Sequence, residues 1–263
     1  MSGDLRVSAN MSMLYADLPV DERPAAAAED GFRYVESWWP FETPSAEEGR
    51  VDSFCRALSR AGVQLVALNL DTGDLRNGER GLLSIPRHVE RVAANLEAVA
   101  DLAARTGCRI VNALYGNRVP DAGPGEQDRL ALRQVVRVAD RLGGLGVTVV
   151  IETLNLVDSP RFPLTDIAAS ATFVRRANAA SRYGNVRLLL DTYHLATMDT
   201  DPAAAVRDHA PLIGHVQFAD FPGRGRPGTG QIDFAAVEKA LRAAGYRGFV
   251  GHEYDPKTGE APA

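Results

Sequence analysis

The residues with the clearest chemical potential stand at the ends of four apolar runs in the second half of the chain. These side chains are Glu152, Asp191, Gln217 and Glu253. Carboxyl groups held close together in a buried site raise one another's pKa, and burial disfavours their charged forms. A divalent cation removes that conflict. Because the set offers hard oxygen donors and no thiolate, it predicts a site for Mg²⁺ or Mn²⁺, with Co²⁺ as a substitute in vitro.

Short β-rich runs alternate with longer helical stretches along the chain, which is the pattern of a parallel sheet built from βα units. Strands are expected near residues 5–14, 32–37, 63–69, 109–114, 146–152, 186–191, 212–219 and 248–253. Helices are expected near residues 21–30, 46–61, 87–106, 126–143, 165–181, 202–210 and 233–244. An open doubly wound sheet usually has a Gly-rich phosphate loop after its first strand, whereas residues 13–17 read MLYAD. The sequence therefore predicts an α/β fold of the (β/α)8 TIM-barrel type.

The end of the chain does not provide the helix that would follow an eighth strand. Residues 254–263 include Pro256, Gly259 and Pro262, which do not support a helix. We therefore expect a single domain over residues 1–263 that lacks a full eighth helix and has a polar tail at about 256–263. Neighbouring helices or a second subunit could close that side, so a homo-oligomer is one expectation.

In such a barrel the catalytic groups lie at the carboxyl ends of the strands, so the four oxygen donors are expected to meet at one mouth. Other polar residues near strand ends could line the same mouth, namely Asn10, Ser12, Asn69, Asn112 and Tyr115. His194, three residues after Asp191, could polarise a substrate. By strand alternation, His215 and His252 are expected to point away from the barrel axis and to be structural.

A Gly/Pro-rich loop at residues 221–230 carries two guanidinium groups, Arg224 and Arg226, shortly after the seventh expected strand. An Arg fork on the catalytic face could hold a substrate carboxylate with two parallel hydrogen bonds, which Lys cannot reproduce. Near the second expected strand, Trp38 and Trp39 could form an apolar wall that excludes water.

Composition and charge indicate a small solute as the partner. The 263 residues carry a formal net charge of −5, and Lys and Arg are scattered rather than gathered in a basic run. This argues against a nucleic-acid or anionic-membrane surface. The two cysteines, Cys55 and Cys108, lie inside apolar patterns, which supports neither a disulfide framework nor a thiolate zinc site. Without a signal-peptide pattern or an apolar run of about 18 residues, a cytoplasmic protein with no membrane segment is expected.

Several segments together resemble the hydroxypyruvate isomerase family of the xylose-isomerase-like barrels. The resemblance runs from residue 5 to about 256, and its most specific motifs are DTYH at 191–194, HVQFAD at 215–220 and PGTG at 227–230. The other matching segments are 10–14, 25–36, 68–74, 112–117, 151–152 and 251–254. The related ketose epimerases typically carry His where this chain has Gln217, which favours the hydroxypyruvate isomerase branch.

The resemblance implies that the four strand-end donors hold the metal and that Glu152 and Glu253 also form the proton-transfer pair. It further implies substrate contacts from His194 and Arg224. The enzyme so implied is an intramolecular oxidoreductase of the aldose–ketose type. It would interconvert hydroxypyruvate and tartronate semialdehyde by proton transfer through an enediolate.

Three alternatives stay open at this level. The same chemistry could act on a larger ketose, an inositol derivative or a four-carbon keto acid. An abasic-site endonuclease on the same barrel would need a basic DNA surface and a His-rich zinc cluster, which an acidic chain with five histidines does not favour. A barrel that only binds a sugar acid, without catalysis, is disfavoured because both Glu152 and Glu253 are retained.

Overall fold

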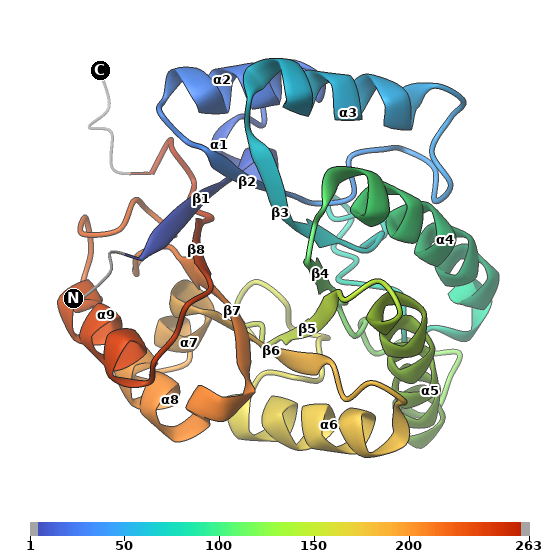
Figure 1. Ribbon diagram of the computed structural model, residues 1–263. Helices are drawn as coiled ribbons and strands as arrows, with labels where there is room; N and C mark the ends of the chain where they lie inside the picture. Colours follow the sequence, from blue (N-terminus) through green and yellow to red (C-terminus); the bar gives the residue numbers. More distant parts are fainter. Residues whose placement is uncertain (1–4, 259–263) are drawn as a thin grey trace.

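The computed structural model describes residues 5–258, which form a closed barrel of eight parallel strands surrounded by helices (Figure 1). The strands follow one another around the barrel in chain order, and β8 closes it by pairing with β1. The strands are β1 (Arg6–Asn10), β2 (Tyr34–Ser37), β3 (Gln64–Asn69), β4 (Ile110–Asn112), β5 (Thr148–Glu152), β6 (Val186–Asp191), β7 (Ile213–Phe218) and β8 (Phe249–His252). The predicted (β/α)8 barrel is confirmed.

All seven predicted helices are present on the outside of the barrel. The helices are α1 (Met11–Leu14), α2 (Arg23–Glu29), α3 (Arg50–Ala61), α4 (Val89–Thr106), α5 (Pro124–Gly143), α6 (Ile167–Ala180), α7 (Thr192–Thr197), α8 (Pro202–His209) and α9 (Phe234–Ala243), with 3-10 helices η1 (Pro86–His88) and η2 (Ala210–Leu212). Their ends follow from the local sequence. Pro124 opens α5 with its backbone dihedral already helical, and Gly107 ends α4 in the left-handed conformation.

The two shortest helices, α1 and α7, are not predicted by the sequence pattern. Residues 11–14 read as the continuation of a strand, but the Asn10 side chain accepts a hydrogen bond from the Ser12 N–H and starts α1 there. In the same way, the Asp191 carboxylate accepts hydrogen bonds from the N–H groups of Tyr193 and His194 and starts α7. Both helices therefore turn the chain at the barrel mouth, directly after a polar strand-end residue.

Strand alternation divides the barrel interior into an apolar and a polar layer. The apolar layer is a small buried cluster of Ala67, Ile110, Val150 and Leu189. The residues two positions further along the same strands are buried and polar: Asn69, Asn112, Glu152 and Asp191. Because side chains two positions apart share a face, the register that buries the apolar layer also points the polar layer into the mouth.

As predicted, the described residues that follow β8 contain no helix as far as Thr258; the remainder of the predicted tail, residues 259–263, lies outside the described residues. The segment after β8 contacts the mouth instead, because the Asp255 N–H donates to the Arg224 carbonyl at 2.8 Å. None of the helices within residues 5–258 has the length and apolar character that crossing a bilayer requires.

Candidate active site

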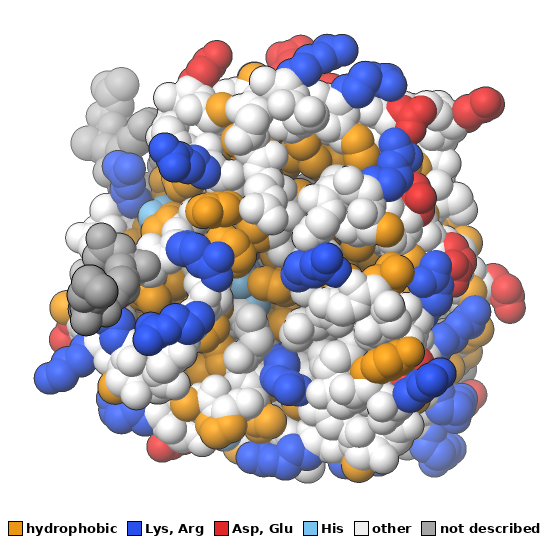
Figure 2. Space-filling view, in the orientation of Figure 1, with side chains coloured by type: hydrophobic (Ala, Val, Ile, Leu, Met, Phe, Trp, Pro, Cys, Tyr) orange, Lys and Arg blue, Asp and Glu red, His pale blue; other side chains and the backbone are white. Residues whose placement is uncertain are grey.

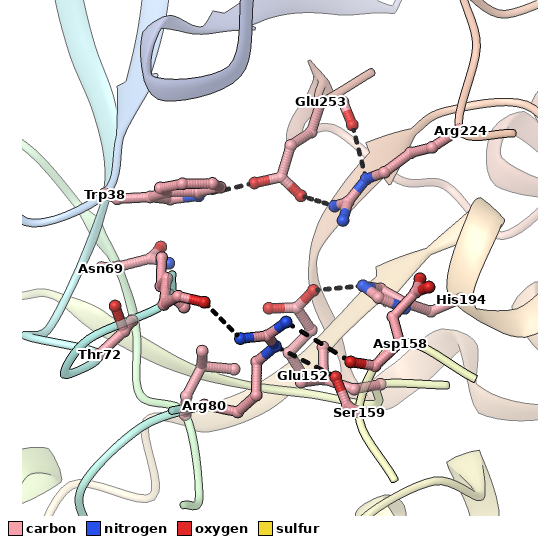
Figure 3. A pocket seen from close by; sticks show the side chains of 13 residues that line it. Trp38, Asn69, Thr72, Arg80, Glu152, Asp158, Ser159, His194, Arg224 and Glu253 are labelled. Carbon is pink, nitrogen blue, oxygen red and sulfur yellow. Dashed lines mark hydrogen bonds and ion pairs between the residues drawn. The ribbon is translucent and has the colours of Figure 1, made fainter. Parts of the chain in front are cut away.

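Three buried carboxyl groups meet at the carboxyl-terminal mouth of the barrel. Glu152 ends β5, Asp191 ends β6 and Glu253 directly follows β8, and each residue is at most 5% exposed. Arg224 connects two of them, because its Nη2 lies 2.7 Å from Glu253 Oε2 and 3.4 Å from Asp191 Oδ2. Figure 3 shows Glu152 and Glu253 directed toward one cavity from different sides. We call Glu152, Asp191 and Glu253 the acidic cluster.

His194 joins the acidic cluster from the first turn of α7. Its Nε2 lies 3.6 Å from Glu152 Oε1 and 4.0 Å from Asp191 Oδ2. Glu152, Asp191 and His194 each offer a ligand atom within 4.8 Å of the other two, so this group could hold a metal ion. Asp191 Oδ1 is occupied by the two N–H groups at the start of α7. Its other oxygen, Oδ2, is therefore the one available to a cation or to Arg224.

The hydrogen bonds of His194 indicate which ring nitrogen carries the proton. Its Nδ1 accepts from the Asn155 backbone N–H at 3.2 Å and lies 2.7 Å from Asn155 Nδ2. Burial lowers the pKa of His194 well below its usual 6.5, so the ring is neutral. A neutral ring whose Nδ1 accepts must carry its proton on Nε2. In this tautomer Nε2 is a donor facing the cavity, which suits a substrate contact better than a metal ligand.

Fixed donors orient the two glutamates. Asn112 Nδ2 donates to Glu152 Oε2 at 2.8 Å. Asn10 Nδ2 and Trp38 Nε1 both donate to Glu253 Oε1, at 2.7 and 2.9 Å. Asn10, predicted as a substrate contact, therefore lies against Glu253 and holds its carboxylate in place. Each glutamate keeps its second oxygen, Glu152 Oε1 and Glu253 Oε2, on the side of His194 and Arg224 respectively.

Burial raises the pKa of every member of the acidic cluster, and repulsion by neighbouring carboxylates adds to the rise for the two glutamates. Burial, followed by the charges of Glu253 and Asp191, raises the pKa of Glu152 well above its usual 4.5. Burial raises the pKa of Glu253 to about 7, although Arg224 opposes the shift. Burial also raises the pKa of Asp191 against the opposing effect of Arg224. One guanidinium therefore does not neutralise three carboxyl groups, and the site favours additional positive charge.

Gln217, the fourth predicted ligand, lies beside Asp191 because the two residues are paired in the register of β6 and β7. Its Nε2 donates to Glu36 Oε2 at 3.0 Å, which fixes the orientation of the amide. Its Oε1 is buried and has no hydrogen-bond partner among the described residues. An unpaired buried oxygen is costly, and a bound cation would satisfy it. The oxygen donors present thus fit a hard divalent metal.

Below Gln217, the carboxylate of Glu36 on β2 is fully paired. Its Oε1 accepts from Ser8 Oγ at 2.6 Å and lies 2.8 Å from His215 Nε2, while its Oε2 accepts from Gln217. Burial alone would raise the pKa of Glu36, but His215, Ser8 and Gln217 outweigh burial and lower it. We call Glu36, Ser8, His215 and Gln217 the paired network.

The prediction that His215 points away from the barrel axis is wrong. His215 lies two residues before Gln217 on β7, so both side chains share the inward face. His252, one residue before Glu253, has its ring against those of Phe32 and Tyr254.

Asp220 fixes the loop that carries Arg224. Its carboxylate accepts hydrogen bonds from the N–H groups of Gly228, Gly230 and Ile232. Arg224 itself has φ of 58°, in the left-handed region, and its Nε donates to the Glu253 carbonyl at 3.2 Å. The guanidinium is therefore already engaged by Glu253 and Asp191 before any substrate is considered.

A cavity of about 410 Å³ opens over the acidic cluster. It is lined by Trp38, Asn69, Thr72, Leu75, Arg80, Leu114, Glu152, Leu154, Asp158, Ser159, His194, Arg224 and Glu253. Three of the predicted substrate contacts, Asn69, His194 and Arg224, lie in this lining. The structure does not bring Tyr115 there, because its ring packs against Phe173 and its hydroxyl donates to Asp128 at 2.6 Å.

The sequence analysis missed Arg80, Asp158 and Ser159 in the cavity lining. These residues lie in loops that follow β3 and β5, where no strand periodicity gives the direction of a side chain. Glu36 was also missed as a functional residue, although a carboxylate inside the expected strand at 32–37 is a signal that could have found it. Of the two tryptophans, Trp38 lines the cavity, while Trp39 donates to the Thr43 carbonyl.

Comparison with known proteins gives the family. A family model described as a xylose isomerase-like TIM barrel matches residues 24–263. A Streptomyces coelicolor protein provisionally named hydroxypyruvate isomerase is 45% identical over 255 residues, which are 96% of this chain and 91% of that protein. The chain belongs to the hydroxypyruvate isomerase family of the xylose isomerase-like TIM barrels.

Two further relatives agree with membership of the hydroxypyruvate isomerase family. The Escherichia coli protein named hydroxypyruvate isomerase is 31% identical over 255 residues, covering 97% of this chain and 95% of that protein. A Cupriavidus necator protein named 2-oxo-tetronate isomerase is 29% identical over 255 residues, covering 97% of this chain and 94% of that protein. These relatives, together with the barrel and its acidic mouth, establish that the chain is an isomerase.

A crystal structure described as an AP endonuclease of family 2 from Brucella melitensis is 29% identical, with a TM-score of 0.86, and covers 97% of this chain and 94% of that chain. The face in Figure 2 carries Lys and Arg side chains between hydrophobic and uncharged atoms, with Asp and Glu side chains mainly toward its edges. Within residues 5–258, the group of acidic, His and Cys side chains able to hold a metal contains one His. A cluster with one His does not fit the endonuclease alternative, which requires a His-rich cluster, and the formal net charge of −5 does not favour the basic surface that DNA binding requires.

Proposed function

We propose that this protein is a divalent-metal-dependent isomerase that interconverts hydroxypyruvate and tartronate semialdehyde. The observation that carries the proposal is the placement of two buried glutamates, Glu152 and Glu253, on different sides of one small cavity at the barrel mouth. The relatives named hydroxypyruvate isomerase and 2-oxo-tetronate isomerase support a small hydroxy-keto acid as the substrate.

The reaction moves one proton between neighbouring carbons. Hydroxypyruvate loses a proton from its hydroxymethyl carbon to give an enediolate, and a proton is returned to the adjacent carbon. The hydroxyl proton of the first carbon passes to the former carbonyl oxygen, which gives the aldehyde and the new hydroxyl group of tartronate semialdehyde. One glutamate would remove the first proton and the other would supply the second. The pKa of Glu253, raised to about 7, suits this exchange, since a group that titrates near neutral pH can both accept and release a proton. The pKa of Glu152 is raised in the same direction.

The metal would be held by Glu152, Asp191, Gln217 and Glu253, with Mg²⁺ or Mn²⁺ as the preferred ion. When bound, it would polarise the carbonyl and stabilise negative charge on the neighbouring oxygens. Of these four residues, Gln217 contributes no titratable group, so it could bind the ion but could not move a proton. His194, with its proton on Nε2, would donate a hydrogen bond to a substrate oxygen.

A four-carbon keto acid such as 2-oxo-tetronate is the second candidate substrate. The cavity of about 410 Å³ is larger than a three-carbon acid requires, and Leu75, Leu114 and Leu154 give its wall an apolar area that a longer chain could contact. Because both candidates have the same carboxylate and the same hydroxy-keto group, they would use the same residues.

Metal-stripped protein reconstituted with Mg²⁺ or Mn²⁺ should be assayed with hydroxypyruvate, 2-oxo-tetronate, neutral ketoses and an inositol derivative. We expect isomerisation of one or both keto acids, loss of activity with EDTA, recovery with either metal, and no requirement for NAD. Full activity in thoroughly metal-stripped protein would contradict metal dependence, and turnover of ketoses alone would contradict the keto-acid assignment.

A further inference from the structure

Arg80 enters the cavity from the loop between β3 and η1, on the side away from Arg224 and Glu253 (Figure 3). Its Nη1 donates to the carbonyls of Leu75 and Glu79 at 3.1 and 2.8 Å. Its Nε donates to Ser159 Oγ at 3.2 Å, and its Nη2 makes one long contact, 3.4 Å, with the Asp158 carbonyl. Among residues 5–258, no carboxylate lies within ion-pair distance of this guanidinium, although it is partly buried.

Arg80 and Arg224 therefore differ in what they can still bind. Arg224 is engaged by Glu253 and Asp191, whose carboxylates are 2.7 and 3.4 Å from its Nη2. A substrate anion at Arg224 would have to compete with those carboxylates for the same donors. Arg80 has only neutral carbonyl and hydroxyl groups as hydrogen-bond partners and forms no ion pair among the described residues, so its Nη2–Nε edge, which makes only the 3.2 and 3.4 Å contacts, can still receive an anion.

The backbone holds Arg80 in one position. Gly81 N–H donates to the Thr72 carbonyl at 2.8 Å, and Gly116 N–H donates to the Arg80 carbonyl at 3.1 Å. Gly81 has φ of 91°, and a Cβ built on it would lie 2.3 Å from the Leu114 carbonyl oxygen. Only glycine fits there. The segment thus packs tightly against the loop after β4, and the guanidinium is preorganised to receive a ligand.

We propose that Arg80 binds the carboxylate of the substrate through its Nη2–Nε edge and sets the preference of the enzyme for keto acids over neutral sugars. This inference rests on the proposed function, because it assigns one end of the same substrate. It also moves the carboxylate-binding role, which the sequence motif suggests for Arg224, to the other side of the cavity.

The charges around the cavity give this arrangement its physical reason. The acidic cluster repels an anionic substrate, whereas the reacting carbons must lie close to Glu152 and Glu253. Arg80 supplies the compensating positive charge on a separate wall, so that the carboxylate end faces Arg80 and the hydroxy-keto end faces the glutamates. A bidentate contact of this kind fixes orientation as well as binding.

The test compares the keto acid with its neutral analogues. Glyceraldehyde and dihydroxyacetone are tartronate semialdehyde and hydroxypyruvate with the carboxylate replaced by a hydroxymethyl group. We expect Arg80→Met to lower kcat/KM for the keto acid by about 10- to 100-fold, the usual value of a charge-assisted contact, and Arg80→Lys to recover only part of it. The effect on the neutral pair should be less than about threefold. Where a neutral triose turns over too slowly, its competitive inhibition constant against the keto acid supplies the same ratio.

The ratio of acid to neutral substrate is measured within each variant, so it does not depend on the amount of folded protein. Arg76→Met is the matched control, because Arg76 is exposed on the same loop and does not line the cavity; its ratio should equal that of the wild type. An unchanged ratio in Arg80→Met, or a collapse in Arg224→Met instead, would overturn the assignment to Arg80. Failure of the wild type to isomerise any keto acid would instead reject the proposed function, and this result is distinguishable from the two that would overturn the role of Arg80.

Discussion

Glu36 and Glu152 are buried glutamates in the same barrel, but their surroundings shift their pKa in opposite directions. In the paired network, His215, Ser8 and Gln217 overcome burial and lower the pKa of Glu36. In the acidic cluster, burial and the neighbouring carboxylates raise the pKa of Glu152. Two things differ: Glu36 has three donors, whereas Glu152 has a single close donor, from Asn112, and is raised further by the charges of Glu253 and Asp191.

This comparison separates a structural charge from a functional one. A buried carboxylate whose donors are supplied by the fold contributes to stability, whereas a cluster left short of positive charge costs stability unless a ligand completes it. Gln217 connects the paired network to the proposed metal site, because its Nε2 donates to Glu36 and its buried Oε1 has no hydrogen-bond partner among the described residues. The paired network thus fixes the orientation of Gln217, one of the proposed metal ligands.

The largest expected effect is on catalysis by the acidic cluster. Glu152→Gln and Glu253→Gln should each lower kcat by about 10²- to 10⁴-fold at saturating metal, because each change retains an oxygen donor but removes the base. The double variant should be little worse than either single one, since groups that act as a unit are not additive. Glu90→Gln, an exposed glutamate on α4, is the control. Exchange of the substrate C–H proton with deuterated solvent at the wild-type rate in either variant would show that the base is another residue.

The two regions should respond oppositely in stability when their glutamates are neutralised. Glu36→Gln should destabilise the metal-free protein by about 1–3 kcal/mol, because His215 loses its buried charged partner. Glu152→Gln should leave it unchanged or stabilise it by about 0.5–2 kcal/mol, because it relieves repulsion in the cluster. Denaturant unfolding at pH 8 measures both. Equal losses in the two variants would remove the distinction between the regions.

Glu36→Gln should also weaken Mn²⁺ binding by about 10- to 100-fold, the usual effect of losing a residue that orients a ligand. The reason is that Gln217 would no longer have a fixed acceptor for its Nε2 and could turn its Oε1 away from the site. Calorimetric titration of folded variant protein gives the affinity. Wild-type affinity in this variant would show that Gln217 is oriented by something other than Glu36.

The pH dependence of stability should also differ in sign between the two regions. The pKa of Glu253 is about 7 in the folded protein against an ordinary 4.5, so its protonated form is favoured on folding. That contribution is fully present below the ordinary pKa and is lost as pH rises through about 7. The lowered pKa of Glu36 gives the reverse, a contribution present above 4.5 and lost on acidification.

We therefore expect the melting temperature of the metal-free wild type to fall between pH 5 and pH 8, by a few degrees. Glu253→Gln should show a smaller fall over the same range. A flat profile in metal-free protein, or an identical profile in Glu253→Gln, would mean that the cluster is not strained by its own charges.

The strand-end positions could be predicted because a single rule governs them. Parallel strands in a closed barrel bring their carboxyl ends together, so Glu152, Asp191, Gln217 and Glu253 follow from the ends of four apolar runs. The same rule of alternation, applied with the correct spacing, would have placed His215 inside the barrel with Gln217. The error came from placing His215 one position before Gln217 instead of two.

Loop residues could not be predicted in this way. The direction of Arg80 depends on the contact of Gly81 with Leu114, which lies 33 positions further along the chain in a different βα unit. The engagement of Arg224 by Glu253 similarly joins two loops that no local pattern relates. Side chains on loops take their direction from tertiary packing. The sequence alone therefore suggested Arg224, in the Gly/Pro-rich loop, as the residue that binds the substrate carboxylate.

Metal binding to the stripped protein tests most directly whether the acidic cluster is built around a cation. Isothermal titration with Mn²⁺ at pH 8 should give one site per chain, an affinity that weakens toward pH 5 as the carboxyl groups become protonated, and loss of that site in Asp191→Asn, whose Oδ2 faces the cluster. Absence of binding at pH 8, or wild-type affinity in Asp191→Asn, would contradict the central claim.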